Sequence, residues 1–103
     1  MDYVKLGRSG LRVSRLCLGT AFRGFWNGHT DAETATKTIY KAVEGGINFI
    51  DCANYYFQGR CEELLGKAIK EMGNRGDLVL TTKVWSQIGE GPNDRGLSRF
   101  HIM

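Results

Sequence analysis

Apolar and polar residues alternate along the first part of the chain. The alternation covers residues 3–6 and 11–13, and the stretch 7–10 between them contains two glycines. Two short alternating runs around a glycine-bearing turn are typical of a β-hairpin. The apolar run Leu16–Leu18 follows and stops at Gly19. An uninterrupted apolar run of this kind predicts a strand buried on both faces.

Two later stretches repeat apolar residues at helical spacing. The first begins at Thr30, because Thr30 and Glu33 fit a capping box, and it ends at the pair Gly45–Gly46. The second covers residues 61–72 and ends at Gly73, since glycine readily adopts the left-handed conformation that follows a last helical turn. The apolar positions are Ala35, Ile39, Ala42 and Val43 in the first helix, and Cys61, Leu64, Leu65, Ala68, Ile69 and Met72 in the second.

Each predicted helix is followed by a predicted strand, at residues 47–51 and 78–84, the latter rich in β-branched residues. Strands that alternate with helices of this length indicate right-handed crossovers and a parallel sheet, which makes the fold class α/β. After residue 84 a polar, glycine-bearing loop leads to the start of a third helix, capped by Ser98. The chain has 103 residues and no linker, so we expect one continuous piece.

The stretch 20–29 reads as a loop with three aromatic residues and two glycines. Two interpretations remain open for it: contact with a ligand, or a cap over the end of the core.

Composition narrows the classes of function. The apolar share of 42% and the charged share of 24% are ordinary for a globular protein. The net charge of +3 comes from basic residues scattered among acids, so no nucleic-acid partner is indicated. No apolar run approaches the ~20 residues that span a bilayer, and the first ten residues do not resemble a signal peptide.

The three cysteines cannot all pair internally, and none forms a C-x-x-C motif. The two histidines, His29 and His101, are far apart in the sequence. These facts argue against a secreted disulfide scaffold and against a metal site. We therefore expect reduced cysteines in a cytoplasmic protein.

Candidate chemistry lies where the predicted strands end. In parallel α/β folds, ligands bind at the carboxyl ends of the strands. Asp51 ends the second strand of the sheet and Lys83 lies at the end of the third, so the two side chains should meet. Tyr55 and Tyr56 follow Asp51 on its loop. An ammonium group lowers the pKa of a neighbouring phenol, which can then protonate a developing alkoxide.

A purely structural interpretation is also available for these residues. A Lys–Asp pair can be a structural ion pair, and a tyrosine on a loop is most often an amphipathic packing residue. Spacing alone does not choose between Tyr55 and Tyr56. The pair Gly66–Lys67 is no phosphate loop, because Ala68 stands where a Ser or Thr is needed.

Several segments in series resemble the N-terminal third of the aldo-keto reductases, above all the branch with bacterial reductases and potassium-channel β subunits. They are LGRSGLRVSRLCLGT, GINFIDCANYY, GRCEELLGKAIK, LVLTTKVW and DRGLSR. The resemblance covers nearly the whole chain. It implies a partial (β/α)8 TIM barrel over residues 1–103, in which an N-terminal hairpin precedes the first three strands and two helices.

The resemblance also implies a reaction and its residues. The family reduces aldehydes and ketones with NADPH, and a tyrosine protonates the carbonyl oxygen. Carried over by position, the catalytic residues are Asp51, Tyr56 and Lys83, with Asp51 orienting Lys83 and Lys83 tuning Tyr56. Tyr55 is then a packing residue. Gly19, Thr20 and Asp51 would contact the cofactor, and Trp85 would lie in the pocket of a small carbonyl substrate.

The family's fourth catalytic residue, usually a histidine on the next strand, has no counterpart here, because neither His29 nor His101 is correctly placed. The parts that grip the NADPH phosphates are also absent, and a barrel of this type needs ~250 residues. We therefore expect a truncated chain with open sheet edges and exposed apolar surface, which does not catalyse turnover alone. The alternatives are a non-catalytic, cofactor-binding subunit of the channel β type and a non-functional fragment. The sequence indicates neither the substrate's identity nor the oligomeric state.

Overall fold

The computed structural model describes residues 1–22 and 31–103. Most of the predicted loop 20–29, together with Thr30 and His29, lies outside the described residues. In chain order the elements are β1 (Tyr3–Lys5), β2 (Arg12–Ser14), β3 (Leu18–Gly19), α2 (Ala32–Glu44), β4 (Phe49–Asp51), η1 (Tyr56–Gly59), α3 (Arg60–Met72), η2 (Arg75–Asp77), β5 (Val79–Thr81) and α4 (Arg99–Ile102).

Strands β1 and β2 form the expected antiparallel hairpin, in which Val4 lies opposite Val13. Gly7 and Gly10 in its turn have φ values of 55° and 80°, which residues with a side chain rarely adopt. The glycine-bearing turn of the sequence is thus the turn of the structure, and this prediction is confirmed.

The other three strands form one parallel sheet in the order β3-β4-β5. Gly19, Asp51 and Thr81 lie side by side at its carboxyl end. Strands β4 and β5 are shorter than the predicted 47–51 and 78–84, because the paired residues are Phe49–Asp51 and Val79–Thr81. The α/β class and the parallel sheet are confirmed, and the sheet of the described residues is open rather than closed into a barrel.

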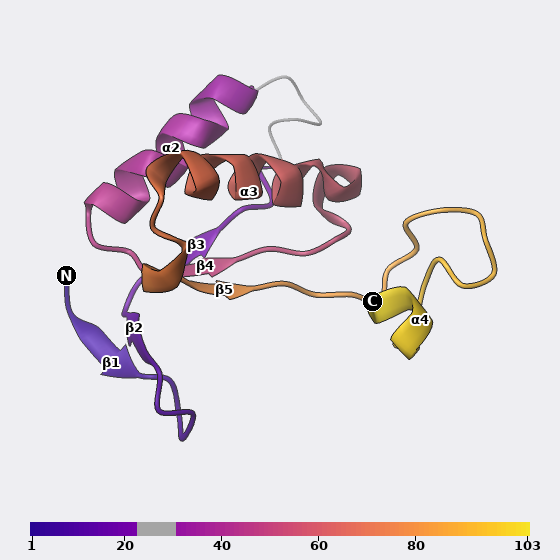
Figure 1. The fold of residues 1–103 in the computed structure, drawn as a ribbon, viewed down its shortest axis with the longest axis horizontal. Helices are drawn as coiled ribbons and strands as arrows, with labels where there is room; N and C mark the ends of the chain where they lie inside the picture. Colours follow the sequence, from indigo (N-terminus) through magenta and orange to yellow (C-terminus); the bar gives the residue numbers. More distant parts are fainter. Residues whose placement is uncertain (23–30) are drawn as a thin grey trace.

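Helices α2 and α3 cover the same face of this sheet (Figure 1). No helix of the described chain lies on the opposite face in that view. The N-cap of α2 is Asp31, whose Oδ1 accepts a hydrogen bond of 2.7 Å from the backbone N–H of Thr34. Thr30 of the predicted capping box lies outside the described residues, and the N-cap position belongs to Asp31, one residue later. Gly73 ends α3 in the left-handed conformation, and Ser98 caps α4, both as expected.

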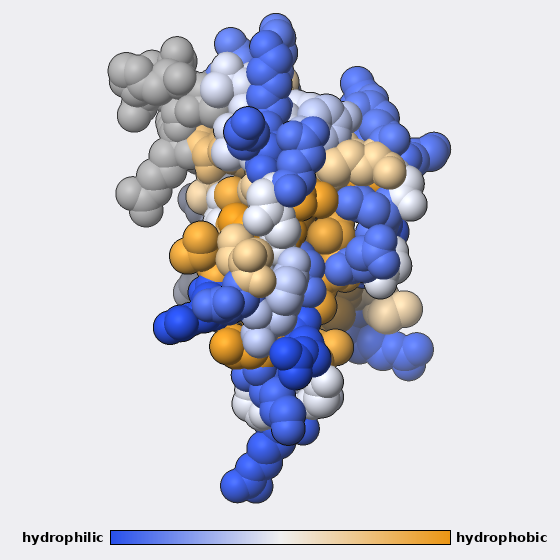
Figure 2. Space-filling view, turned by 90° about the vertical axis from the view of Figure 1, so that its left-hand side faces the viewer, coloured by the Kyte–Doolittle hydropathy of each residue, from blue (hydrophilic) through white to orange (hydrophobic). Residues whose placement is uncertain are grey.

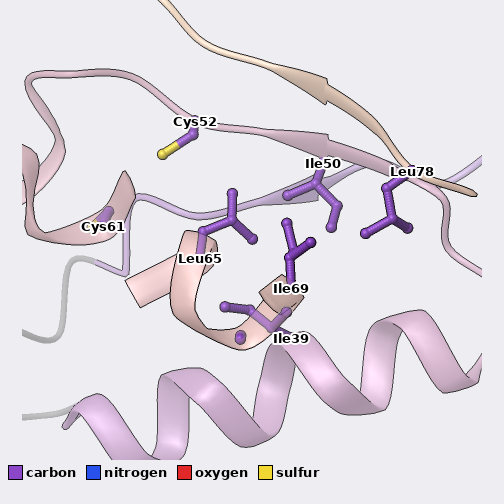
Figure 3. Close-up of a cluster of buried hydrophobic side chains, with 8 residues drawn as sticks. Ile39, Ile50, Cys52, Cys61, Leu65, Ile69 and Leu78 are labelled. Carbon is purple, nitrogen blue, oxygen red and sulfur yellow. The ribbon is translucent and has the colours of Figure 1, made fainter. Parts of the chain in front are cut away.

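The core lies between the two helices and the sheet. Ile39 of α2 and Leu65 and Ile69 of α3 pack toward Ile50 of β4, with Leu78 directly before β5 (Figure 3). Ile39 and Ile50 have no exposed surface. The helical spacing of apolar residues thus predicted correctly which side of each helix is buried.

The expectation of a doubly buried strand at Leu16–Leu18 is wrong. Strand β3 begins only at Leu18, Leu16 is 59% exposed, and Cys17 is exposed. Both residues precede the strand and therefore lie outside the sheet, and among the described residues helices cover only one face of that sheet. Apolar side chains also reach the surface on the side drawn in Figure 2, where hydrophilic ones surround them. This agrees with the expected exposure of apolar surface.

The hairpin is attached to the sheet at the amino end of β4. The side chain of Asn48 accepts a bond of 2.7 Å from Ser14 N–H and donates one of 3.1 Å to Arg12 O. The hydroxyl of Tyr3 donates a bond of 2.7 Å to Gly46 O. These bonds fix one end of the strand whose other end is Asp51.

None of the helices in the described ranges has the length and apolarity of a membrane span.

Candidate active site

Asp51 and Lys83 meet at the carboxyl end of the sheet. Asp51 is the last residue of β4, and Lys83 comes two residues after the end of β5. Lys83 Nζ lies 2.6 Å from Asp51 Oδ2 and 2.7 Å from Cys52 O, to which it also donates. Thr81 donates its hydroxyl to the other carboxylate oxygen, Asp51 Oδ1, at 2.6 Å. The proximity expected from parallel strands is confirmed.

The backbone beyond the strands holds this geometry. Cys52 N–H donates to Thr81 O at 2.8 Å, and Asn54 N–H donates to Lys83 O at 3.0 Å. The parallel pairing thus continues past the strand ends as single hydrogen bonds. Asp51 and Lys83 therefore lie on neighbouring stretches of chain, so their side chains can meet.

The ion pair shifts both pKa values in the direction that favours charge. Burial by itself raises the pKa of Asp51, but the hydrogen bonds from Lys83 and Thr81 and the charge of Lys83 outweigh it, and the net pKa is lowered. Burial lowers the pKa of Lys83, but the bonds and charges of Asp51 and Tyr56 outweigh it, and the net pKa is raised. Lys83 is therefore a fixed cation at neutral pH.

Tyr56 is the tyrosine that faces this cation. It begins η1 and is half-buried, and Lys83 Nζ lies 5.0 Å from the centre of its ring. The next two residues, Phe57 and Gln58, have φ values of 47° and 54°, so the chain turns sharply directly after Tyr56. Tyr55 is 49% exposed, and its role as a packing residue stays a prediction.

Gly19 and Thr20 lie beside Asp51, at the end of β3. Thr20 is fully buried, and both its N–H, at 3.1 Å, and its hydroxyl, at 2.9 Å, donate to Asp51 O. Gly19 is exposed, and no atom lies within 4 Å of the position that a Cβ would take. The structure thus ties Thr20 to the backbone of Asp51 and leaves open space at Gly19.

Trp85 lies two residues beyond Lys83, and its side chain is largely in solvent, with 68% exposed. It lines a hollow of about 590 Å³ together with Tyr55, Ser86, Gln87 and Gly89. Sequence reasoning placed Trp85 near the site but missed Tyr55 as its neighbour across this hollow.

Sequence reasoning also missed Thr81 and the carbonyl of Cys52. Thr81 could have been found, because it lies two residues before Lys83 and adjacent to Asp51 in the predicted parallel pairing. The Cys52 carbonyl gives no sequence signal, because the backbone of every residue carries the same carbonyl group. Over residues 1–22 and 31–103, no cluster of three or more His, Cys, Asp or Glu side chains could hold a metal ion.

The site brings together an ammonium group, a carboxylate and a phenol in one solvent-accessible region. Asp51 and Lys83 keep 36% and 49% of their side-chain surface exposed, so a small molecule can reach them. A fixed ammonium group beside a phenol is suited to proton donation onto a developing oxyanion.

Known proteins are similar to this chain in sequence. Residues 15–103 match the model of the aldo/keto reductase family. Over 105 residues the chain is 46% identical to a probable voltage-gated potassium channel subunit beta of Oryza sativa subsp. japonica, with 100% of this chain and 31% of the relative aligned. It is 45% identical over 111 residues to the uncharacterized oxidoreductase YrpG of Bacillus subtilis (strain 168), with 99% of this chain and 33% of the relative aligned. The chain thus spans about a third of the length of these relatives.

Solved structures agree with the sequence comparisons. The holo form of the aldo-keto reductase AKR11C1 from Bacillus halodurans superposes with a TM-score of 0.73 and 39% identity, over 84% of this chain and 27% of that one. The thermostable aldo-keto reductase Tm1743, solved with the inhibitor epalrestat, has a TM-score of 0.68 and 40% identity, over 82% of this chain and 31% of that one. A family match that covers most of the chain, with relatives in both sequence and fold, establishes that this chain belongs to the aldo/keto reductase family.

Proposed function

We propose that this chain supplies the proton-donating corner of an NADPH-dependent reductase of aldehydes and ketones. The observation that carries the proposal is the position of Lys83 Nζ, which is bonded to Asp51 at 2.6 Å and lies 5.0 Å from the centre of the Tyr56 ring. Tyr56 would be the proton donor, Lys83 its electrostatic partner and Asp51 the group that orients Lys83.

The proposed proton step uses these three residues in order. The Tyr56 hydroxyl donates its proton to the carbonyl oxygen as that oxygen gains negative charge, and the phenolate left behind is stabilised by the ammonium group of Lys83. Asp51 and the Cys52 carbonyl hold this ammonium group in place through two acceptors. NADPH, when bound, supplies the hydride for the carbonyl carbon.

The space at the end of β3 fits a flat cofactor ring. Gly19 is exposed and has no neighbouring atom where a side chain would begin, so a planar group can approach the backbone closely there. Asp51 lies beside it in the parallel register. Gly19 and Asp51 would therefore lie nearest the ring, while the buried Thr20 would act by fixing the backbone of Asp51.

The wider architecture is part of the same proposal. Strands β3, β4 and β5 would be the first three strands of a (β/α)8 barrel, with β1 and β2 as the hairpin that precedes it. Residues 1–103 would then be the N-terminal part of one domain. The open sheet and the helices on a single face support this assignment.

The first test is the mass of the native polypeptide, detected with an antibody against residues 51–83. The polypeptide so identified is then assayed for carbonyl-dependent oxidation of NADPH. We expect Tyr56→Phe to lower the rate by about 10²- to 10⁴-fold, the usual contribution of general acid catalysis. Tyr55→Phe, one residue away, should retain most of the rate. Full activity in Tyr56→Phe would refute the assignment.

A second candidate function is a regulatory subunit that binds the cofactor without turnover. The observation in its favour is the 46% identity to probable channel β subunits of Oryza sativa and Arabidopsis thaliana. In that case the native polypeptide would bind NADPH, would not oxidise it with any carbonyl compound, and would be unaffected by Tyr56→Phe. For the 103-residue chain alone we expect no steady turnover under either function.

A further inference from the structure

Three consecutive residues with positive φ follow the proposed proton donor. Phe57, Gln58 and Gly59 have φ values of 47°, 54° and 89°, so the chain makes a left-handed turn between Tyr56 and α3. Glycine adopts this conformation freely, whereas any other residue then has its Cβ too close to the following carbonyl oxygen. Two of the three residues therefore hold a backbone conformation that their own side chains oppose.

The residues on either side of this turn are right-handed. Tyr55 has a φ of −81° and a ψ of −24°, and Arg60, which begins α3, has a φ of −65° and a ψ of −29°. Without the left-handed turn, the chain could run from Tyr55 into α3 as one helix. Because the turn interrupts that path, Tyr56 stays outside α3, where Lys83 Nζ lies 5.0 Å from the centre of its ring.

The side chain of Phe57 supplies the contacts that can enforce the turn. A strained backbone persists only where the surrounding structure imposes it. The Phe57 ring is half-buried and packs against the core cluster, to which Cys61 and Leu65 of α3 belong. Arg60 Cζ lies 5.2 Å from the centre of the same ring, within the ~6 Å of a cation–π contact. The ring is thus held by one apolar and one cationic contact.

Gln58 provides a comparison within the same turn. Its φ is close to that of Phe57, but its side chain is exposed. Its backbone N–H donates to Tyr55 O at 3.1 Å, which closes the chain around Tyr56. Packing can therefore impose the left-handed conformation at Phe57, and the exposed Gln58 follows because its neighbour is fixed.

We propose that Phe57 is a positioning residue for the proton donor: its ring, held by the core and by Arg60, forces the left-handed turn that keeps Tyr56 against Lys83. The inference rests on the proposed function and adds to it a residue that acts through Tyr56.

The test measures the position of Tyr56 in the full 103-residue chain. In a nuclear Overhauser spectrum at neutral pH, the Tyr56 ring protons should give a cross-peak with the ε-methylene protons of Lys83. Phe57→Ala removes the ring and keeps a Cβ that opposes positive φ, so this cross-peak should be lost. Phe57→Gly also removes the ring but leaves no Cβ, so the turn is permitted again and part of the cross-peak should return.

The order of these two variants separates positioning from packing. A ring that only filled the core would leave a cavity in both variants, and glycine would then have no advantage over alanine. A cross-peak unchanged in Phe57→Ala, or no stronger in Phe57→Gly than in Phe57→Ala, would overturn the proposal. Gln58→Gly is the matched control, because it relieves the same backbone strain at an exposed position, and it should keep the whole cross-peak. Loss of the cross-peak in Gln58→Gly would also contradict the proposal.

Arg60 is tested separately, because its exposed side chain can be replaced without a cavity in the core. Arg60→Met keeps an apolar chain without the cation and should weaken the cross-peak, whereas Arg60→Lys keeps a cation and should preserve it. Tyr56 is one of the groups that raise the pKa of Lys83. The titration midpoint of the Lys83 ε-methylene signal should therefore fall in Arg60→Met. An unchanged cross-peak and midpoint would overturn the proposal, and this variant decides alone if Phe57→Ala does not fold.

These measurements are independent of the reaction. A cross-peak lost in Phe57→Ala, together with full activity of Tyr56→Phe in the native polypeptide, would leave the positioning in place and remove Tyr56 as the proton donor. A cross-peak kept in Phe57→Ala, together with activity lost in Tyr56→Phe, would keep the proton donor and remove the role of Phe57.

Discussion

Strand β4 is only three residues long, yet different chemical groups meet at its two ends. At the amino end, neutral groups meet: the Asn48 amide bonds the hairpin, and the Tyr3 hydroxyl bonds Gly46 O. At the carboxyl end, the charged groups of Asp51 and Lys83 meet, each still partly in solvent. The comparison leads us to expect that stability depends more on the end without charges and that the proposed chemistry takes place at the end that has them.

The largest effect should come from breaking the amino end. Asn48→Ala removes the acceptor of Ser14 N–H, and Ser14 is only 2% exposed. A buried donor left without a partner costs about 2 kcal/mol, so the free energy of unfolding should fall by about that amount. Urea denaturation followed by circular dichroism measures it. The same change at the exposed Asn93 is the control, and an equal loss there would show that the bond to Ser14 is not the cause.

A smaller effect is expected from the other bond at that end. Tyr3→Phe removes one hydroxyl that donates to Gly46 O at 2.7 Å, at a partly exposed position. Such a bond contributes about 1 kcal/mol. Tyr55→Phe, whose ring is exposed, should change the unfolding free energy by less than ~0.5 kcal/mol. Identical denaturation curves for wild type and Tyr3→Phe would show that this bond does not contribute to the free energy of unfolding.

The smallest effect on stability should come from the charged end, and it should depend on pH. The lowered pKa of Asp51 means that its contribution is present above the ordinary value of 3.8 and is lost as pH falls through the lowered pKa. The raised pKa of Lys83 means that its contribution is present below 10.5 and is lost as pH rises through the raised pKa. Because both side chains are partly exposed, each contribution should stay below ~1 kcal/mol.

The pH dependence is measured by urea denaturation from acid to alkaline pH. Asp51→Asn should flatten the fall in stability at acid pH, and Lys83→Met should flatten both limbs, because it removes the partner of Asp51 as well as its own titration. A Lys83→Met variant that loses several kcal/mol at neutral pH would show that the charged end carries stability too, and would reverse the comparison.

Much of the fold could be predicted from local pattern. The periodicity of Ile39, Leu65 and Ile69 identified the buried faces of α2 and α3, and the glycine turn identified the hairpin. Burial around Leu16 and Cys17 could not be predicted in the same way. An apolar run reports what a strand prefers, whereas the exposure of Leu16 depends on what covers the second face of the sheet.

The candidate site, like the fold, could be predicted from the sequence only in part. The pairing of Asp51 with Lys83 follows from parallel strands, so the sequence was sufficient. The sharp turn of the chain directly after Tyr56 depends on the left-handed conformations of Phe57 and Gln58, which neither residue type favours. The loop after Trp85 is closed by the hydrogen bond from Gly96 N–H to Trp85 O, and its sequence has no periodic pattern. Such features are set by tertiary structure and become visible only in three dimensions.

The bond between Asn48 and Ser14 has a consequence for the order of folding. It joins residues 34 positions apart, whereas the hairpin turn spans only a few residues. Closing a long loop costs entropy that must be spent before the contact forms, so local pairings come first. We expect the hairpin to form early and to remain a separate, mobile arm until β4 pairs with its neighbours. The last step is then the docking of the hairpin, which the hydrogen bonds of the Asn48 amide hold in place.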